Sequence, residues 1–121
     1  MTEIPRKLII PNERPKSWND FYSGMHWKAR KDYAEMIHGL VRSYLDPNDP
    51  IFECRVDILV MVYFDKYPYD PCNIPAKLYI DGLHGWWIKD DTREFVRRET
   101  TQSEIDRDNP RIEITATPVE E

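Results

Sequence analysis

The apolar segment of residues 52–64 is the feature that most limits the fold of this chain. It reads FECRVDILVMVYF, is rich in β-branched residues, and is apolar on both sides of a strand between Ile58 and Val62. Such a strand is typical of the middle of a sheet that is covered on both faces. Residues 66–71 lead out of its end through two prolines. The sequence therefore predicts one central strand that opens directly into a proline-rich turn.

Shorter patterns on either side of this strand predict a small α+β domain. The expected elements are a strand over residues 6–11, a loop to about residue 25, a helix over 27–45, a short helix starting between 73 and 75, and strands over 95–101 and 111–117. An apolar stripe at helical spacing marks the long helix, formed by Tyr33, Met36, Ile37, Leu40, Val41 and Tyr44. We assign Trp27, with Tyr33, to packing. The order β-α-β-α-β-β predicts a single domain over residues 1–121, with a mostly antiparallel mixed sheet and two helices on one side.

The composition limits the setting of the protein. With 40% hydrophobic and 32% charged residues the chain is typical of a globular domain, and no apolar run approaches the length of a membrane span. The N-terminus has no signal-peptide character, so we expect a cytoplasmic protein without a membrane partner. Two cysteines are too few for a disulfide framework. We assign Cys54 to a core position on the central strand and Cys72 to a small, neutral filler.

The net charge of −5 is opposed to general nucleic-acid binding, but the charge is unevenly distributed. Residues 1–45 hold eight Lys or Arg against five Asp or Glu. In this part a basic group lies among Trp18, Tyr22 and Trp27 and is formed by Lys16, Lys28, Arg30 and Lys31. These residues suit phosphate contacts and base stacking, although a solvated helix face explains them equally well. Arg97 and Arg98 are DNA-binding candidates too, with a charged edge strand as the alternative.

Residues 69–91 contain the candidate chemistry. They read YDPCNIPAKLYIDGLHGWWIKDD and bring together Lys77 and the acids Asp70, Asp81, Asp90 and Asp91. Hard cations such as Mg²⁺ take oxygen ligands and leave positions for substrate phosphate. A metal held in this way activates water and neutralises charge at a phosphodiester, and a nearby lysine steadies developing negative charge. The segment therefore predicts a divalent-metal site, with Mg²⁺ or Mn²⁺ as the cofactor.

A short helix should arrange these groups. Pro75 belongs in a first helical turn, and Asn73 is the expected N-cap. Helical spacing places one set of residues on the buried side, namely Ala76, Tyr79, Ile80 and Leu83. It places Lys77, Asp81 and His84 on another side, before glycines end the helix. We expect His84 to be an exposed helix-end residue and zinc to be disfavoured, and only one of Asp90 and Asp91 to share a metal with Asp70.

The pattern Asp-x-x-Asn, then lysine, Asp-Gly-Leu and a final Asp-Asp resembles the RusA-type Holliday junction resolvases of bacteria and their prophages. The likeness also includes residues 8–11 and 18–20, but its specificity lies in residues 70–91. The resemblance implies a homodimeric, Mg²⁺-dependent endonuclease that nicks four-way DNA junctions symmetrically in recombination and repair. It also implies that Asp70 and Asp91 bind the metal, that Lys77 is the active-site lysine, and that Asp90 and Asp81 are supporting acids.

The sequence departs from the family pattern at two places. Cys72 stands where the family has a second aspartate, and cysteine is a poor ligand for a hard metal. Lys77 also lies one residue further from Asn73 than is usual, with a compensating shortening before Asp90. Asp81 or a water then replaces the lost ligand in an active enzyme. The alternatives are a catalytically degenerate protein that binds DNA junctions, and an acidic interaction domain without a DNA partner.

Overall fold

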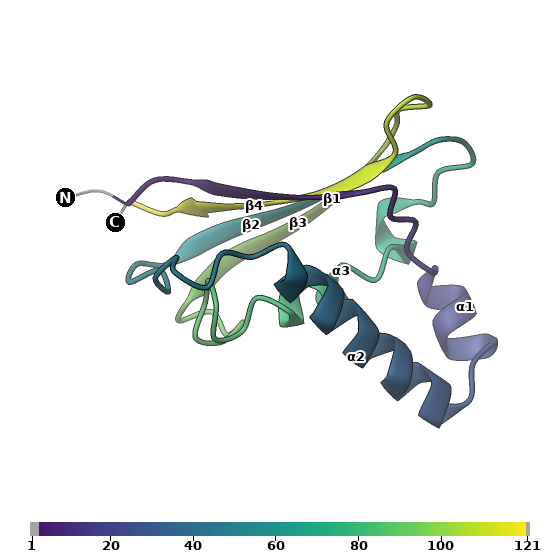
Figure 1. Ribbon diagram of the computed structural model, residues 1–121, viewed down its shortest axis with the longest axis horizontal. Coiled ribbons are helices and arrows are strands. Elements are labelled where there is room, and N and C mark those ends of the chain that lie inside the picture. Colours follow the sequence, from purple (N-terminus) through teal and green to yellow (C-terminus); the bar gives the residue numbers. More distant parts are fainter. Residues whose placement is uncertain (1–2, 121) are drawn as a thin grey trace.

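The structure is a computed structural model that describes residues 3–120, and it has an α+β arrangement in two layers (Figure 1). A four-stranded sheet forms one layer, and the helices lie along one of its faces. In chain order the elements are β1 (Arg6–Pro11), α1 (Trp18–Ser23), α2 (Trp27–Ser43), β2 (Val56–Phe64), the 3₁₀ helix η1 (Pro71–Asn73), α3 (Ala76–Asp81), β3 (Val96–Ile105) and β4 (Arg111–Pro118). The predicted fold class is confirmed, but these residues form three α-helices and η1 instead of two helices.

The strand order places the predicted site on the connection between two parallel strands. The order is β1-β4-β2-β3, in which β4 is antiparallel to both β1 and β2, and β2 is parallel to β3. As expected, β2 has a neighbour on each side. Parallel strands need a long crossover connection, because a tight hairpin can join only antiparallel ones. Residues 65–95 form this crossover, and they include η1, α3 and the carboxylate-rich stretch.

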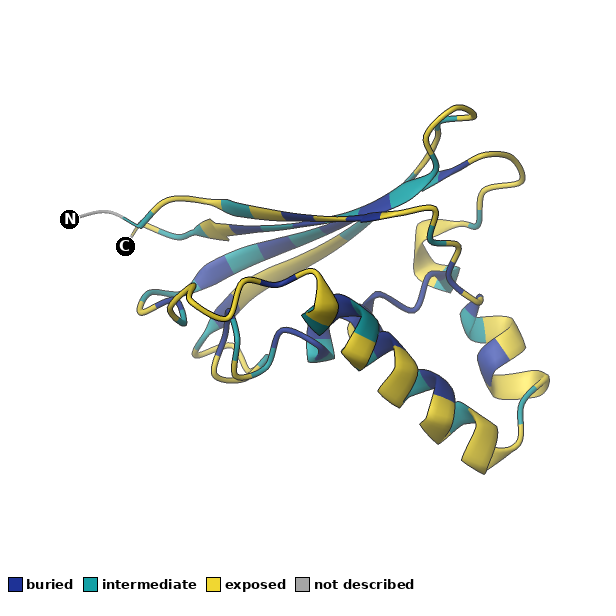
Figure 2. Cartoon of the chain, viewed as in Figure 1, coloured by how far each residue is buried: buried dark blue, intermediate teal, exposed yellow. Residues whose placement is uncertain are grey.

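The prediction that the central strand is buried on both faces is wrong. Along β2 buried residues alternate with half-buried ones, and Val56, Ile58, Val60, Val62 and Phe64 form the buried row. The helices cover this row, whereas Leu59 and Met61 point to the outer face, which no helix among residues 3–120 covers (Figures 1 and 2). The apolar composition of β2 therefore led to a prediction of more burial than the strand has.

α1 replaces part of the loop expected to extend to about residue 25. Ser17 is its N-cap, and the Ser17 Oγ accepts a hydrogen bond of 3.0 Å from the backbone N–H of Asp20. Such a cap satisfies one of the free N–H groups at a helix start. Phe21 is the buried residue of α1. A helix of six residues is too short to be recognised from the spacing of its apolar residues. The sequence signal for α1 was Ser17, a residue type that favours the N-cap position.

α2 confirms the long helix but not the whole predicted stripe. Tyr33, Ile37 and Val41 are its buried residues, at a spacing of four. Three residues expected to pack are exposed, namely Trp27, Met36 and Tyr44. The apolar side facing the sheet is therefore narrower than predicted, and Trp27 presents 61% of its surface to solvent. No helix within residues 3–120 has the length and apolar character needed to cross a membrane.

The middle of the inner face of β3 is polar, although it continues the buried row of β2 and the row has Val96 and Ile105 at its ends. In the parallel register Ile58 pairs with Glu99, Val60 with Thr101 and Val62 with Ser103. Side chains of paired residues lie on the same face of a sheet. β3 is the edge strand, as expected, and extends to Ile105 instead of residue 101. These polar residues lie outside the apolar core, and Glu99 among them interacts with the charged residues of α3.

Candidate metal centre

α3 places two of the expected site residues on its exposed side. The helix covers Ala76–Asp81, so it starts after the predicted residues 73–75 and ends before His84. Its inner residues Tyr79 and Ile80 are buried, as predicted. Lys77 and Asp81 are one helical turn apart on the other side, with 3.4 Å between Lys77 Nζ and Asp81 Oδ1. Burial of the inner side fixes the rotation of the helix, so the two charged groups face away from the core.

The predicted N-cap of α3 is wrong. Pro75 holds the cap position and makes no side-chain cap hydrogen bond. Asn73 belongs to η1, and its Oδ1 accepts a hydrogen bond of 3.1 Å from the backbone N–H of Asn19. Asn73 therefore links α1 to the segment that follows Asp70.

A tight return after α3 delivers Asp91. Leu83 is fully buried, and its carbonyl accepts hydrogen bonds from the N–H groups of Trp87 and Ile88 at 3.0 and 3.3 Å. Gly85 has a φ of +81°, which glycine adopts without the cost that a Cβ would bring. Trp87 and Ile88 are both buried and anchor the chain on the core. Asp91 Oδ2 then lies 2.7 Å from Lys77 Nζ.

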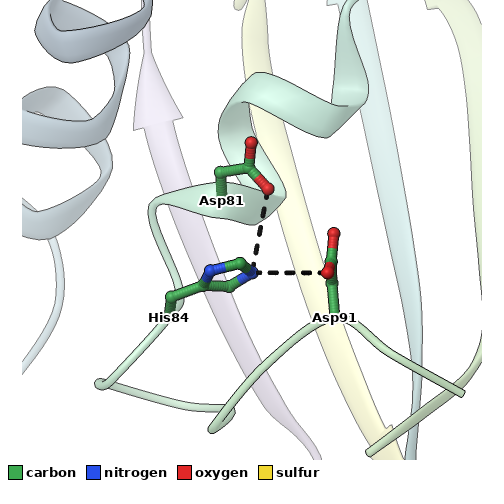
Figure 3. Close-up of side chains that lie close together, drawn as sticks. All are labelled: Asp81, His84 and Asp91. Carbon is green, nitrogen blue, oxygen red and sulfur yellow. Dashed lines mark ion pairs between the residues drawn. The ribbon is translucent and has the colours of Figure 1, made fainter.

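His84 completes a group of three possible metal ligands (Figure 3). Its Nε2 lies 3.7 Å from Asp81 Oδ1 and 3.9 Å from Asp91 Oδ1. One ligand atom from each of the three residues lies within 4.8 Å of the others. The expectation of an exposed helix-end histidine is wrong, because the ring is half-buried and Nε2 is shielded from solvent.

The hydrogen bond between Lys77 and Asp91 favours the charged form of both groups. The hydrogen bond to Asp91 raises the pKa of Lys77 above its ordinary value, and Asp81 adds to the effect. The same bond lowers the pKa of Asp91. Near neutral pH, Lys77 is a cation between two carboxylates. The arrangement can hold positive charge, whether that charge is an ammonium or a metal ion.

Glu99 is the acidic neighbour that the sequence did not reveal. Partial desolvation raises the pKa of its carboxyl, and the negative charge of Asp91 raises it further. Asp81 acts in the same direction, while the Lys77 ammonium opposes them. Only the pairing of Glu99 with Ile58 on the inner face places it beside the cluster. That pairing joins residues far apart in the chain, and local periodicity carries no signal for it.

The other predicted acids lie outside the three-residue group. Asp70 is exposed just before η1, which lies against β3. Asp90 is exposed, and its Oδ1 accepts a hydrogen bond of 2.8 Å from the backbone N–H of Asp91. Of the adjacent pair, Asp91 faces the cluster, whereas Asp90 holds the backbone. That Asp70 shares a metal with Asp91 stays a prediction.

Neither cysteine belongs to this group. Cys72 is exposed on η1. Cys54 is half-buried and precedes β2, so its assignment to a core strand position is wrong.

The predicted DNA-binding residues divide between two places. Arg97 bonds Asp57 on the outer face at 2.6 Å, and Arg98 pairs in register with that aspartate. Of the other four residues, Lys28, Arg30 and Lys31 lie at the start of α2, next to the α1–α2 junction. Lys16 precedes α1, and its ammonium lies 5.9 Å from the centre of the Tyr33 ring. At the junction the Arg30 guanidinium lies 5.8 Å from the centre of the Tyr22 ring, and Tyr22 stacks on Trp18. We call the exposed residues Tyr22, Trp27, Lys28, Lys31 and the adjoining Arg30 the aromatic–basic corner.

Comparisons with known proteins give no family assignment for this chain. No protein-family model matches the sequence, and no curated protein matches it either. The resemblance to the RusA-type resolvases therefore rests on the residues of the chain itself.

Proposed function

We propose that this protein is a metal-dependent, structure-selective endonuclease of the RusA type that cuts four-way junctions or other branched DNA. The observation that carries the proposal is the convergence of Asp81 and Asp91 on Lys77, at 3.4 and 2.7 Å. An ordinary surface ion pair within one helix would join Lys77 to Asp81 alone. Here α3 and the return that follows it meet, beside Glu99 of β3.

The donor set fits a divalent cation. Asp81 and Asp91 supply carboxylate oxygens, and Glu99 adds an acidic group beside them. Asp70 is exposed just before η1, which lies against β3. When bound, the ion supplies charge neutralisation at the phosphodiester and activates the attacking water. The side chain of Lys77 is 61% exposed and can turn toward the phosphate, where its charge would steady the negative charge that develops during reaction.

The proposed reaction is hydrolysis of a phosphodiester. The oxygen of one water forms a bond to phosphorus, the bond from phosphorus to one ester oxygen breaks, and the leaving oxygen takes up a proton. Asp90 contributes by holding the backbone N–H of Asp91, which fixes the direction of that carboxylate. Precise positioning of such groups on a rigid scaffold is what this chemistry requires.

Binding of branched DNA is assigned to the aromatic–basic corner. Its cations provide phosphate contacts, while Trp27 is 61% exposed and offers a ring face to unpaired bases. Tyr22 is 63% exposed and is held beside this surface by stacking on Trp18. The bond from Asn19 to Asn73 ties this corner to η1 and hence to the segment that carries Asp70. We propose that two copies act together in the cytoplasm, since paired nicks in a four-way junction need two sites.

The test is cleavage of a labelled four-way junction and of a linear duplex of equal length, with and without Mg²⁺ or Mn²⁺. Paired nicks in the junction alone, dependent on metal and abolished in Asp91→Asn, would support the proposal. Asp108→Asn is the matched control, because Asp108 is an exposed residue in the turn between β3 and β4. It should cut like the unaltered protein.

The exposed Cys72, in the place of the family's second aspartate, favours one alternative: a degenerate protein that binds junctions without cutting them. Junction binding without nicks in either metal would establish that alternative. Absence of any junction binding would overturn both functions.

A further inference from the structure

His84 has no role in the proposed function, yet its ring points into the cluster (Figure 3). Its Nε2 is buried and makes no hydrogen bond to any of residues 3–120. The distances of 3.7 and 3.9 Å to the Asp81 and Asp91 oxygens exceed ordinary hydrogen-bond lengths. Nε2 and the two carboxylate oxygens therefore face one another across a space that a single ligand could bridge.

The backbone holds His84 in this place. His84 forms an isolated parallel bridge with Ile88, which is buried, and the preceding Leu83 is buried as well. The imidazole therefore projects from a fixed turn. Asp81 comes from the last turn of α3, so two of the three groups are positioned by packed segments. Such support is what keeps ligands in place before an ion binds.

We propose that Asp81, His84 and Asp91 form a mixed nitrogen–oxygen site that selects a first-row transition ion, such as Mn²⁺, Co²⁺ or Zn²⁺, over Mg²⁺. Ligands of one such ion lie roughly 3 to 3.5 Å apart, given bonds of about 2.1 Å. The three atoms, within 4.8 Å of one another, need a small inward movement to reach that geometry. Imidazole favours transition ions, whereas Mg²⁺ prefers oxygen ligands alone.

Lys77 occupies the charge position that the ion would take. Its ammonium bonds Asp91 Oδ2 at 2.7 Å and lies 3.4 Å from Asp81 Oδ1, so it would repel an ion bound to these carboxylates. Because the lysine side chain is largely exposed, it can move into solvent. Removal of the ammonium should therefore strengthen ion binding, the opposite of what removal of a ligand does.

This inference deepens the proposed function and rests on the same site, but it is tested without DNA. The intact protein is titrated with Co²⁺, and binding is followed by the visible absorption of the bound ion and by calorimetry. We expect one ion per chain, not displaced by a large excess of Mg²⁺. His84→Gln and Asp81→Asn should weaken binding at least about tenfold. Lys77→Met should tighten it.

His26→Gln is the matched control, since His26 is an exposed histidine at the start of α2. It should bind Co²⁺ like the unaltered protein, and circular dichroism of every variant checks the fold. Equal affinity in His84→Gln and the unaltered protein, or ready displacement by Mg²⁺, would overturn the inference even if Mg²⁺-dependent nicking persists. Tight, His84-dependent Co²⁺ binding supports the inference, and if junction nicking is then absent with every ion, only the endonuclease proposal fails.

Discussion

Asp57 and Arg97 form a two-point ion pair on the outer face of the sheet. Arg97 Nε lies 3.0 Å from Asp57 Oδ1, and Nη2 lies 2.6 Å from Oδ2. A bidentate contact of this kind is stronger and more directional than a single charge contact. The hydrogen bond lowers the pKa of Asp57 below its ordinary value. Arg97 is thereby bound to a carboxylate on the face opposite the helices, which argues against its predicted role in DNA binding.

The lowered pKa of Asp57 predicts a dependence of stability on acid. A carboxylate whose folded pKa is below its unfolded value of about 3.9 stabilises the fold above that value, and this contribution is lost as pH falls through the folded pKa. Because Arg97 is partly exposed, the contribution is about 1 kcal/mol or less. Urea unfolding at pH 7 and pH 3 should show a smaller loss for Asp57→Asn than for the unaltered protein. An equal loss in both would contradict the assignment.

The contact between α2 and α3 depends on Gly82, which directly follows α3. A Cβ built at this glycine would lie 2.8 Å from Val41 Cβ and 3.0 Å from Val41 Cγ1. Its φ of −66° is open to any residue, so the effect of a side chain here is steric alone. Gly82→Ala should lower the free energy of unfolding by about 1 to 3 kcal/mol, the usual cost of overpacking. Urea unfolding measures this change.

Gly39 provides the control for that experiment. It lies within α2, and a Cβ added there meets no atom within 4 Å. Alanine has a higher helix propensity than glycine, so Gly39→Ala should raise the free energy of unfolding by about 0.5 to 1 kcal/mol. The two substitutions are chemically the same and should have opposite signs. Stabilisation by Gly82→Ala would show that α2 and α3 do not meet as closely as described.

The α1–α2 junction makes a separate prediction about DNA. Trp27 begins α2 and is largely exposed, whereas other residues form the buried side of the helix. If its ring stacks on an unpaired base, Trp27→Ala should weaken junction binding by about 1 to 3 kcal/mol. Met36→Ala removes another exposed apolar residue of the same helix and should leave binding unchanged. Fluorescence anisotropy with a labelled junction, without metal, measures both affinities.

For single helices and strands, local sequence patterns predicted the features that depend on neighbouring residues in the chain. The strand expected over residues 111–117 is present, and the spacing of Ala76, Tyr79 and Ile80 correctly identified the buried face of α3, because the helix buries one side. The same approach failed at Trp27, since the width of a buried face depends on what packs against it. It also failed on the outer face of β2, which has apolar residues but no cover from the helices.

For the molecule as a whole, the candidate centre was only partly visible in the sequence. Helical spacing placed Lys77 and Asp81 on one side of α3, the family resemblance implied Asp91, and the structure brings the three together. His84 was expected to be an exposed residue at the end of the helix, and its partial burial follows from the return of the chain after α3. Glu99 joins through the β2–β3 register alone. What escaped prediction is therefore what depends on contacts distant in sequence.

The uneven charge of the whole chain predicts how junction binding responds to salt. A net charge of −5 should repel DNA at long range. The affinity must therefore come from the cations of the aromatic–basic corner and from Lys16, which precedes α1. Four phosphate contacts give a slope of log affinity against log salt of roughly −3 to −4. Changing Lys28 and Lys31 to glutamine should reduce that slope by about two. Lys7→Gln alters a lysine that is paired with Glu113 on the outer face of the sheet, so it should leave the slope unchanged. Equal slopes for all three proteins would place the DNA elsewhere on the molecule.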